Sequence, residues 1–385
     1  MSFEKSIISL IKSSLDGSMP QVADDFDFKF AFEFSKAHQI ISLVYRGLAS
    51  DKKLKEHPCF KEFEQASYYM TYIDIQQKYE TDSIFLEFDK NGIDYMPLKG
   101  TIIKDLYPSP EMRTMSDADI LIREEQKGKA RAVMASLGFS ECCESNHEIS
   151  FQKGNIYIEL HKHLIPTYNL DFDRYYGDSW AFAKKQVGHR HFMSNEDFYV
   201  YIFTHFAKHF RDKGAGVKYV VDFYVYKKAF ANLDYEYIEK VLKDLSLYRF
   251  HENVMRLVDV WFNDKEGDEV TLYLAKKIFR EGVYGSEKNS SMSYALRGAK
   301  TYKNVKSKNF SIAVFPPFSY MKEKYPILKK VCILLPFFWI VRWVGVLFKP
   351  KKISQRVKNI NEMPALAESY REELNFVGLD YNFDK

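Results

Sequence analysis

The stretch YMPLKGTIIKDLYPSPEMRTMSDADILI, residues 95–122, decides the fold of this chain. It opens with a short β-type run that ends at Lys99-Gly100 and continues into a helical pattern. It closes with DADILI, residues 117–122, in which polar and apolar residues alternate before the run becomes fully apolar. The first pattern is typical of a strand that turns into a helix, and the second of a strand with one deeply buried face.

Helical and hairpin patterns flank this stretch. A long helical pattern from about Phe60 ends at Asn91-Gly92, a sequence that commonly stops a helix. Residues 123–139 follow an amphipathic helix pattern, and Lys153-Gly154-Asn155 separates two β-type runs as a hairpin turn does. The order predicts an α+β fold, in which a small mixed β-sheet at roughly 85–165 is flanked by mainly helical N- and C-terminal regions.

The length and composition indicate a globular protein of more than one domain. The chain has 385 residues, of which 46% are hydrophobic and 28% charged, so it is too apolar to be disordered. We expect a helical region at 1–84, the sheet-containing core at 85–165, a second helical region at 166–300 and a C-terminal helical region with an apolar segment at 301–385.

Charge and cysteine content argue against several classes of protein. The 56 Lys and Arg residues against 52 Asp and Glu residues give a formal charge of +4, so no binding of duplex nucleic acid is expected. The four cysteines form no CxxC pair, which favours reduced thiols in a cytosolic protein. Residues 1–18 lack the features of an export signal. We therefore expect a cytoplasmic protein.

An apolar segment near the C-terminus complicates this picture. The segment 331–348 is interrupted by Pro336 and Arg342, whereas a spanning helix needs about 20 apolar residues without interruption. Our first interpretation is a buried helix, and our second a helix that lies on a membrane surface. A basic run, KPKK at 349–352, would suit peripheral contact with acidic lipids through residues 326–352.

Three acids are candidates for a metal site on the predicted sheet. Asp117 and Asp119 are one residue apart on a strand, so both side chains point to one face. Glu159 lies in the strand IYIELH, on the face that it shares with Tyr157 and His161. Two aspartates alone are more often solvated or capping groups. A third acid on a neighbouring strand completes a set of oxygen ligands for divalent metals.

Two features before the aspartates suit a phosphate group. Lys99-Gly100 stands where the strand turns into a helix, so glycine permits close backbone approach and the helix start offers unpaired N–H groups. Arg113 carries a guanidinium that can donate two parallel hydrogen bonds to phosphate oxygens.

The string 95–122, followed later by IELH at 158–161, resembles an uncharacterised nucleotidyltransferase family of the DNA-polymerase-beta-like nucleotidyltransferase superfamily. In that family a hydrophobic-Lys-Gly turn precedes a Tyr-Pro, an Arg and an Asp-x-Asp strand, and an acid precedes Leu-His. The resemblance covers residues 90–165 well, and extends more loosely to THFAKHF at 204–210 and YVVDF at 219–223.

The resemblance implies a nucleotidyltransferase that moves a nucleoside monophosphate from a nucleoside triphosphate to an unknown acceptor. It implies that Asp117, Asp119 and Glu159 are catalytic and bind two Mg²⁺ ions, and that Lys99-Gly100 lines the nucleotide phosphates. Arg113 would offset charge on the same phosphates. The sequence departs from the superfamily at one point, because its usual Gly-Ser turn is Lys-Gly here.

The histidines near these motifs have more than one interpretation. His161 would orient Glu159 or contact substrate, or form a structural hydrogen bond at the strand end. His205 and His209 lie four residues apart on one helix face. They would form a structural pair or would contact substrate or phosphate. Asp222, in an apolar helix, is expected to pair with the lysine one turn before it or with one of these histidines.

Two rival classes of function stay open. One is a catalytically inactive module that senses nucleotide or binds a partner, with its helices carrying the activity. The other is a membrane-peripheral assembly protein anchored through residues 326–352.

Overall fold

The computed structural model describes residues 1–282, 314–315, 318, 321, 325–329, 331–347 and 365–379. The chain divides into two compact units, one formed by Met1–Phe210 and Gly214–Gly285 and the other by Arg211–Lys213 and Ser286–Lys385. The sheet and all the candidate site residues lie in the first unit. The division into four segments that the sequence suggests stays a prediction.

The N-terminal part of the first unit is helical. Its helices are α1 (Phe3–Asp16), α2 (Phe28–Ala37), α3 (Ile41–Ala49), α4 (Lys52–Lys55) and the long α5 (Phe60–Lys90). The side chains of Ser2 and Asp27 cap α1 and α2 by accepting hydrogen bonds from backbone N–H groups of the first turn. The stop predicted at Asn91-Gly92 is confirmed, and Gly92 takes a φ of 65° that favours glycine.

Five strands form the mixed sheet: β1 (Tyr95–Pro97), β2 (Ala118–Ile122), β3 (Ser140–Glu144), β4 (Glu148–Lys153) and β5 (Ile156–His161). Their order in the sheet is β1-β2-β5-β4-β3. The β2–β5 pair is parallel, and the β1–β2, β4–β5 and β3–β4 pairs are antiparallel. The α+β fold and the hairpin around Gly154 are therefore confirmed. Strand β3 was not predicted, because all five of its residues are exposed and show no alternation.

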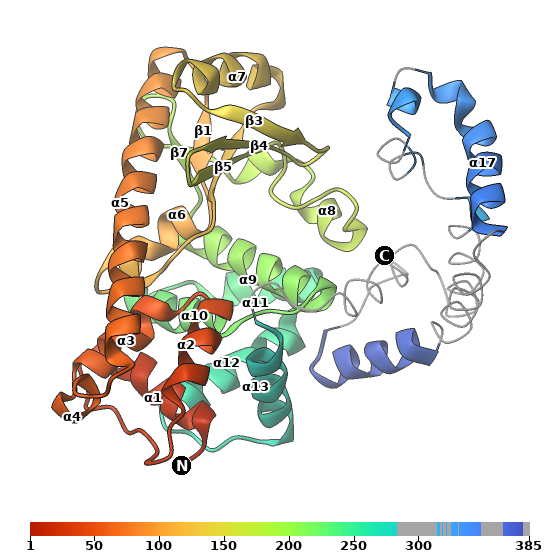
Figure 1. Ribbon diagram of the computed structural model, residues 1–385. Coiled ribbons are helices and arrows are strands. Elements are labelled where there is room, and N and C mark those ends of the chain that lie inside the picture. Colours follow the sequence, from red (N-terminus) through yellow and green to blue (C-terminus); the bar gives the residue numbers. More distant parts are fainter. Residues whose placement is uncertain are drawn as a thin grey trace. The chain divides into compact units, whose positions relative to one another are not determined.

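One face of the sheet forms a hydrophobic core with α5 and with α7 (Lys127–Ser136), which lie beside it in Figure 1. The core includes alternate residues of β2 and β5 together with side chains from both helices: Ala118, Ile120, Ile122, Ile156, Ile158, Leu160, Phe85, Phe88, Val133 and Met134. Burying a large apolar side chain contributes about 1.5–3 kcal/mol, so these residues fix the strand register. The same alternation sends Asp119, Glu159 and His161 to the opposite face.

Short elements connect the strands and lead out of the sheet. Between β1 and β2 lie α6 (Gly100–Ile103) and two 3₁₀ turns, Lys104–Leu106 and Pro110–Met112; a third 3₁₀ turn, Glu124–Gln126, precedes α7. After β5 come α8 (Leu170–Tyr176), the 3₁₀ turn Ser179–Phe182, and a two-stranded ribbon of β6 (Lys184–Lys185) and β7 (His191–Phe192).

A second group of helices completes the first unit: α9 (Asn195–Asp212), α10 (Val217–Ala229), α11 (Tyr235–Asp244), α12 (Tyr248–Phe262) and α13 (Glu269–Glu281). Aromatic rings fill its interior, where Phe206 lies within 5.6 Å of both Phe223 and Phe250, measured between ring centroids. Figure 1 shows α9 between the sheet and the other helices of this group. That position brings one face of α9 opposite the polar face of the sheet.

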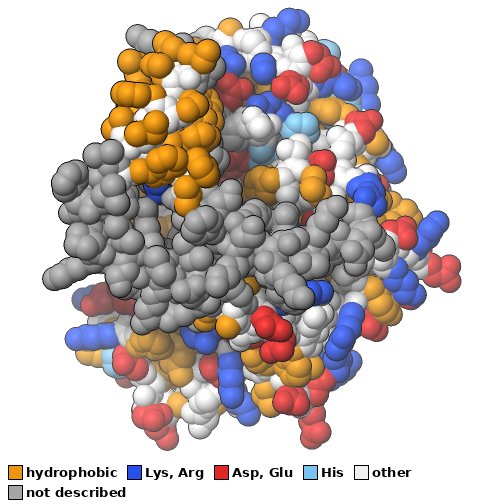
Figure 2. Space-filling model, turned by 90° about the vertical axis from the view of Figure 1, so that its right-hand side faces the viewer, with side chains coloured by type: hydrophobic (Ala, Val, Ile, Leu, Met, Phe, Trp, Pro, Cys, Tyr) orange, Lys and Arg blue, Asp and Glu red, His pale blue; other side chains and the backbone are white. Residues whose placement is uncertain are grey.

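In the second unit, the 3₁₀ turn Pro326–Lys329 precedes the apolar segment, which forms the 3₁₀ turn Cys332–Leu334 and the helix α17 (Leu335–Leu347). The side chains of Ile333, Phe337 and Ile340 are exposed, so the expected buried helix is wrong for this face. Figure 2 shows a patch of hydrophobic side chains on the molecular surface, at the upper left of that view. None of the helices in the described ranges has the length and apolar character needed to cross a membrane. The basic run 349–352 lies outside the described residues.

Candidate active site

The parallel pairing of β2 and β5 brings Asp119 and Glu159 directly opposite each other. Asp119 is almost fully buried, whereas the Glu159 side chain is 25% exposed. Asp117 lies just before β2, and burial together with repulsion by Asp119 and Glu159 raises its pKa to about 6. The structure therefore brings Asp119 and Glu159 together on one face of the sheet, and Asp117 lies close enough for its charge to interact with theirs.

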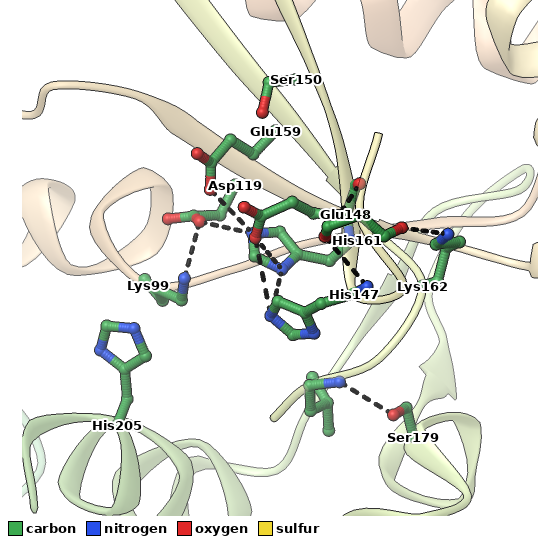
Figure 3. A network of polar contacts seen from close by, with 12 residues as sticks. Lys99, Asp119, His147, Glu148, Ser150, Glu159, His161, Lys162, Ser179 and His205 are labelled. Carbon is green, nitrogen blue, oxygen red and sulfur yellow. Dashed lines mark hydrogen bonds and ion pairs between the residues drawn. The ribbon is translucent and has the colours of Figure 1, made fainter. Parts of the chain in front are cut away.

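Lys99 contacts this acid cluster, which we define as Asp117, Asp119 and Glu159. Its Nζ donates a hydrogen bond to Asp119 Oδ1 at 2.7 Å, as Figure 3 shows. Burial alone would lower the pKa of Lys99, but the charge of Asp119 holds it well above its ordinary value. The same ion pair keeps the pKa of Asp119 well below its usual range despite burial. Both groups are therefore charged at neutral pH.

The turn at Lys99-Gly100 has an unusual backbone. Lys99 takes a φ of 47° and a ψ of −119°, a region that side chains other than glycine rarely adopt. Gly100 is required for a different reason, because a Cβ there would lie 2.5 Å from Met115 Sδ and 2.6 Å from Arg113 Nη1. The N–H of Leu98 donates to the carbonyl of Asp119 at 3.0 Å, which ties this turn to β2.

Arg113 forms its paired hydrogen bonds with a carboxylate of the helical region. Its Nε and Nη2 donate to the two oxygens of Asp222 at 3.1 and 2.9 Å, and the Tyr107 hydroxyl donates to Asp222 Oδ1 at 2.7 Å. The expected pairing of Asp222 with a lysine or histidine is therefore wrong. Lys218, one turn before it, donates instead to the side-chain oxygen of Gln39. The contact of Arg113 with nucleotide stays a prediction.

His161 joins the acid cluster to a second pair of residues. Its Nε2 lies 2.7 Å from Asp119 Oδ1 and 3.5 Å from Glu159 Oε2, and its Nδ1 lies 3.1 Å from His147 Nε2. Burial and the nearby Lys99 lower the pKa of His161, but its hydrogen bonds to the two carboxylates leave it above the ordinary value. Of the alternatives for His161, the structure shows an orienting contact with the acids.

His147 and Glu148 were missed in the sequence. Glu148 is the cross-strand partner of His161, and that pairing can be counted outward from the Lys153–Ile156 pair beside the hairpin turn. His147 precedes β4 and belongs to no strand, so no periodic pattern indicates its position.

His205 and His209 contact each other on α9, with 3.1 Å between their Nε2 atoms. Figure 3 shows His205 pointing from α9 toward Lys99. Burial and the positive charge of Lys99 hold the pKa of His205 well below its ordinary value, so its ring is neutral at pH 7. The structure thus pairs the two histidines and orients one of them to the site. Contact of either with substrate stays a prediction.

A comparison with known protein families places this chain in a class, the nucleotidyltransferases. Residues 24–263, more than half of the chain, match a family described as "uncharacterised nucleotidyltransferase". The chain therefore belongs to this family, and the resemblance seen in the sequence is confirmed. No curated protein matches the chain. One solved structure that does is the solution structure of the antibiotic-resistance factor ANT(2'')-Ia, at 14% identity and a TM-score of 0.33, covering 50% of this chain and 100% of that one.

Proposed function

We propose that this protein transfers a nucleoside monophosphate from a nucleoside triphosphate to an acceptor hydroxyl or a similar nucleophile, with Mg²⁺ bound at the acid cluster. One observation carries this proposal: Asp119 and Glu159 lie opposite each other in the β2–β5 register, beside the Lys99-Gly100 turn. A lysine and a set of carboxylates then lie together where a triphosphate and its metal ions would bind. The N–H groups of Thr101, Ile102 and Ile103 donate to the carbonyls of Leu98 and Lys99, so the expected unpaired N–H groups of the helix start are not part of this proposal.

The donor set fits magnesium. All three members of the acid cluster offer carboxylate oxygens, which Mg²⁺ prefers, and the raised pKa of Asp117 reflects its burial and its repulsion by the other two. Asp117, Asp119 and Glu159 would hold the ions. Bound Mg²⁺ would polarise the phosphoryl group and stabilise the pyrophosphate that leaves.

The residues around the cluster have separate tasks in this proposal. Lys99 and His161 both contact Asp119 Oδ1, which fixes the orientation of that carboxylate. The ammonium of Lys99 would also offset negative charge that accumulates on the phosphates. The reaction forms a bond between the acceptor oxygen and the α-phosphorus, breaks the bond to pyrophosphate and releases the acceptor's proton. Glu159, the more exposed carboxylate of the facing pair, would accept that proton.

Binding can be tested before the acceptor is known. Titration calorimetry with a nonhydrolysable nucleoside triphosphate should show binding that requires Mg²⁺, and pyrophosphate release should follow once a panel of sugars, metabolites and proteins supplies an acceptor. Asp119→Asn and Glu159→Gln should both abolish turnover. Glu159→Gln should retain the melting temperature, whereas Asp119→Asn also removes the partner of the Lys99 ammonium and should lower it, so circular dichroism is needed to show that this variant is folded. Asp82→Asn, on the exposed surface of α5, is the matched control. Nucleotide binding that ignores Mg²⁺, or turnover that survives both site variants, would refute the proposal.

A catalytically inactive nucleotide-binding module is the second candidate. The observation that favours it is the ion pair of Lys99 with Asp119, which places an ammonium against a carboxylate that the enzyme needs for metal. This candidate predicts that nucleotide binding persists without Mg²⁺ and that Asp119→Asn leaves the biological activity intact.

The exposed apolar side chains of α17 support a further proposal, peripheral membrane contact of a cytoplasmic protein through residues 326–352. Flotation with anionic liposomes should recover the full chain and leave a chain truncated before Pro326 in the soluble fraction. Equal recovery of the two chains would contradict it.

A further inference from the structure

Three side chains beside the acid cluster point toward one another, on the side of the His161 ring that does not contact Asp119. His161 Nδ1, His147 Nε2 and Glu148 Oε2 face one another, as Figure 3 shows. The distance between the two nitrogens is 3.1 Å, and Glu148 Oε2 lies 3.8 Å from His161 Nδ1 and 3.7 Å from His147 Nε2. The triangle uses the nitrogen of His161 that does not contact Asp119.

The end of the β4–β5 hairpin holds these side chains in place. Glu148 and His161 are paired across the two strands, and the N–H of Lys162 donates to the carbonyl of His147 at 2.8 Å. Ser145 Oγ accepts hydrogen bonds from the N–H groups of His147 and Glu148, each at 3.1 Å. The backbone is therefore fixed on both sides of the triangle, as a preformed ligand set requires.

The edges of this triangle are close in length to those of a metal coordination shell. Zinc binds imidazole nitrogen and carboxylate oxygen at about 2.0–2.2 Å in tetrahedral geometry, which separates neighbouring ligand atoms by about 3.3–3.6 Å. The observed separations of 3.1, 3.7 and 3.8 Å bracket that range. Two imidazoles and one carboxylate also select a metal of borderline softness over Mg²⁺, which prefers oxygen ligands.

We propose that His147, Glu148 and His161 form a binding site for a borderline divalent metal such as Zn²⁺, distinct from the acid cluster. Two histidines, one glutamate and an open fourth position are a known zinc ligand set. Glu148 is 28% and His147 13% exposed, so the site opens to solvent on their side.

The contacts around the triangle suit metal binding. Asp119 Oδ1 lies 2.7 Å from His161 Nε2 and accepts a hydrogen bond from Nε2–H, so the neutral ring carries its lone pair on Nδ1. A carboxylate that orients a ligating histidine in this way is the usual support of a zinc site. His147 Nδ1 is buried without a hydrogen-bond partner among the described residues, whereas its Nε2 lies 3.1 Å from His161 Nδ1. In the metal-free protein one of these two facing nitrogens carries a proton. Metal binding would displace that proton, so that His147 is protonated on Nδ1 and both facing nitrogens offer lone pairs to the metal.

Occupancy of this site would act on the acid cluster through one residue. His161 presents Nδ1 to the proposed metal and Nε2 to Asp119, so a metal at Nδ1 would fix the ring that orients Asp119. The metal site itself does not depend on the proposed transferase activity, because its ligands are defined by their own geometry.

The test is metal binding by the full chain after it has been stripped with a chelator. Titration with Zn²⁺ by calorimetry, and with Co²⁺ by visible absorption, should show one saturable site with the spectrum of tetrahedral Co²⁺. His147→Gln and Glu148→Gln should each weaken binding at least about 10-fold, since even the residues behind a ligand commonly contribute that much. His57→Gln, a histidine between α4 and α5, is the control and should bind as the wild type does.

Two further variants separate this site from the acid cluster. Asp117→Asn and Glu159→Gln should keep Zn²⁺ binding within about threefold, although both belong to the proposed nucleotide site. Absence of saturable binding in the wild type would overturn the proposal. So would binding that survives both His147→Gln and Glu148→Gln but is lost with Glu159→Gln, because the metal would then belong to the acid cluster. Circular dichroism of each variant excludes loss of fold as the cause.

Discussion

Replacing Asp117 by Asn should stabilise the metal-free protein, although the residue belongs to the proposed active site. Burial and the charges of Asp119 and Glu159 raise the pKa of Asp117 from 3.8 to about 6. The fold thus disfavours its ionised form. The penalty is absent below pH 3.8, grows as the pH rises through about 6, and is complete at pH 8.

The size of the effect follows from this pKa. The rise in the pKa of Asp117 from 3.8 to about 6 lowers the free energy of unfolding by about 3 kcal/mol at pH 8 and by about half of that at pH 5. Asp117 keeps partial contact with solvent, which reduces the value at pH 8 to about 1–3 kcal/mol. With roughly 2 °C for each kcal/mol in a protein of this size, Asp117→Asn should raise the melting temperature by about 2–6 °C.

Thermal unfolding in a chelator at pH 5 and pH 8 measures this difference. Asp117→Asn should melt above the wild type at pH 8 and by a smaller margin at pH 5, and Mg²⁺ with nucleotide should stabilise only the wild type. The control Asp82→Asn loses one exposed ion pair with Lys78 and should change stability by no more than about 0.5 kcal/mol at either pH. If Asp117→Asn melts below the wild type at pH 8, or by a margin that does not depend on pH, the charge repulsion inferred here is wrong.

Other variants test the parts of the site separately. Arg113→Gln leaves the buried carboxylate of Asp222 without its guanidinium and should destabilise the protein by about 3–5 kcal/mol in denaturant unfolding, whereas an effect below 1 kcal/mol would contradict a buried pair. Gly100→Ala places a methyl group against Met115 and against Arg113, which Asp222 restrains; we expect a loss of about 1–3 kcal/mol and weaker nucleotide binding by calorimetry. His205 is buried and neutral, so wild-type stability should fall as the pH drops below 6.5, and melting curves of His205→Gln should show a smaller fall.

Periodicity predicted the part of the site that lies on strands. The alternation in DADILI and IYIELH separates apolar from polar residues, and the structure buries Ile120 and Leu160 on one face while it brings Asp119 and Glu159 together on the other. The parallel pairing of these strands could not be derived from either pattern alone. The resemblance implied that the acids bind metal together, but the direction of the strand pairing was not predicted.

The missed features have no periodic signal in the sequence. Strand β3 is fully exposed, so no apolar residues mark it. Asp222, the partner of Arg113, lies 109 residues further along the chain on α10, and an acid in that helix could pair with any cation near it. His147 lies in a turn, where position depends on the hairpin geometry rather than on spacing. Tertiary contacts therefore determine these features, which local sequence patterns do not predict.

The Lys-Gly turn, which stands where the superfamily usually has Gly-Ser, has a strained backbone at Lys99. A side chain in that left-handed conformation costs on the order of 1–3 kcal/mol, a cost that glycine would avoid. The turn is nevertheless held there, because the Lys99 carbonyl accepts hydrogen bonds from the N–H groups of Ile102 and Ile103 and its ammonium reaches Asp119. The strain is thus offset by a buried charge pair. In the proposed reaction, the same ammonium supplies beside the phosphates a positive charge that a serine hydroxyl cannot.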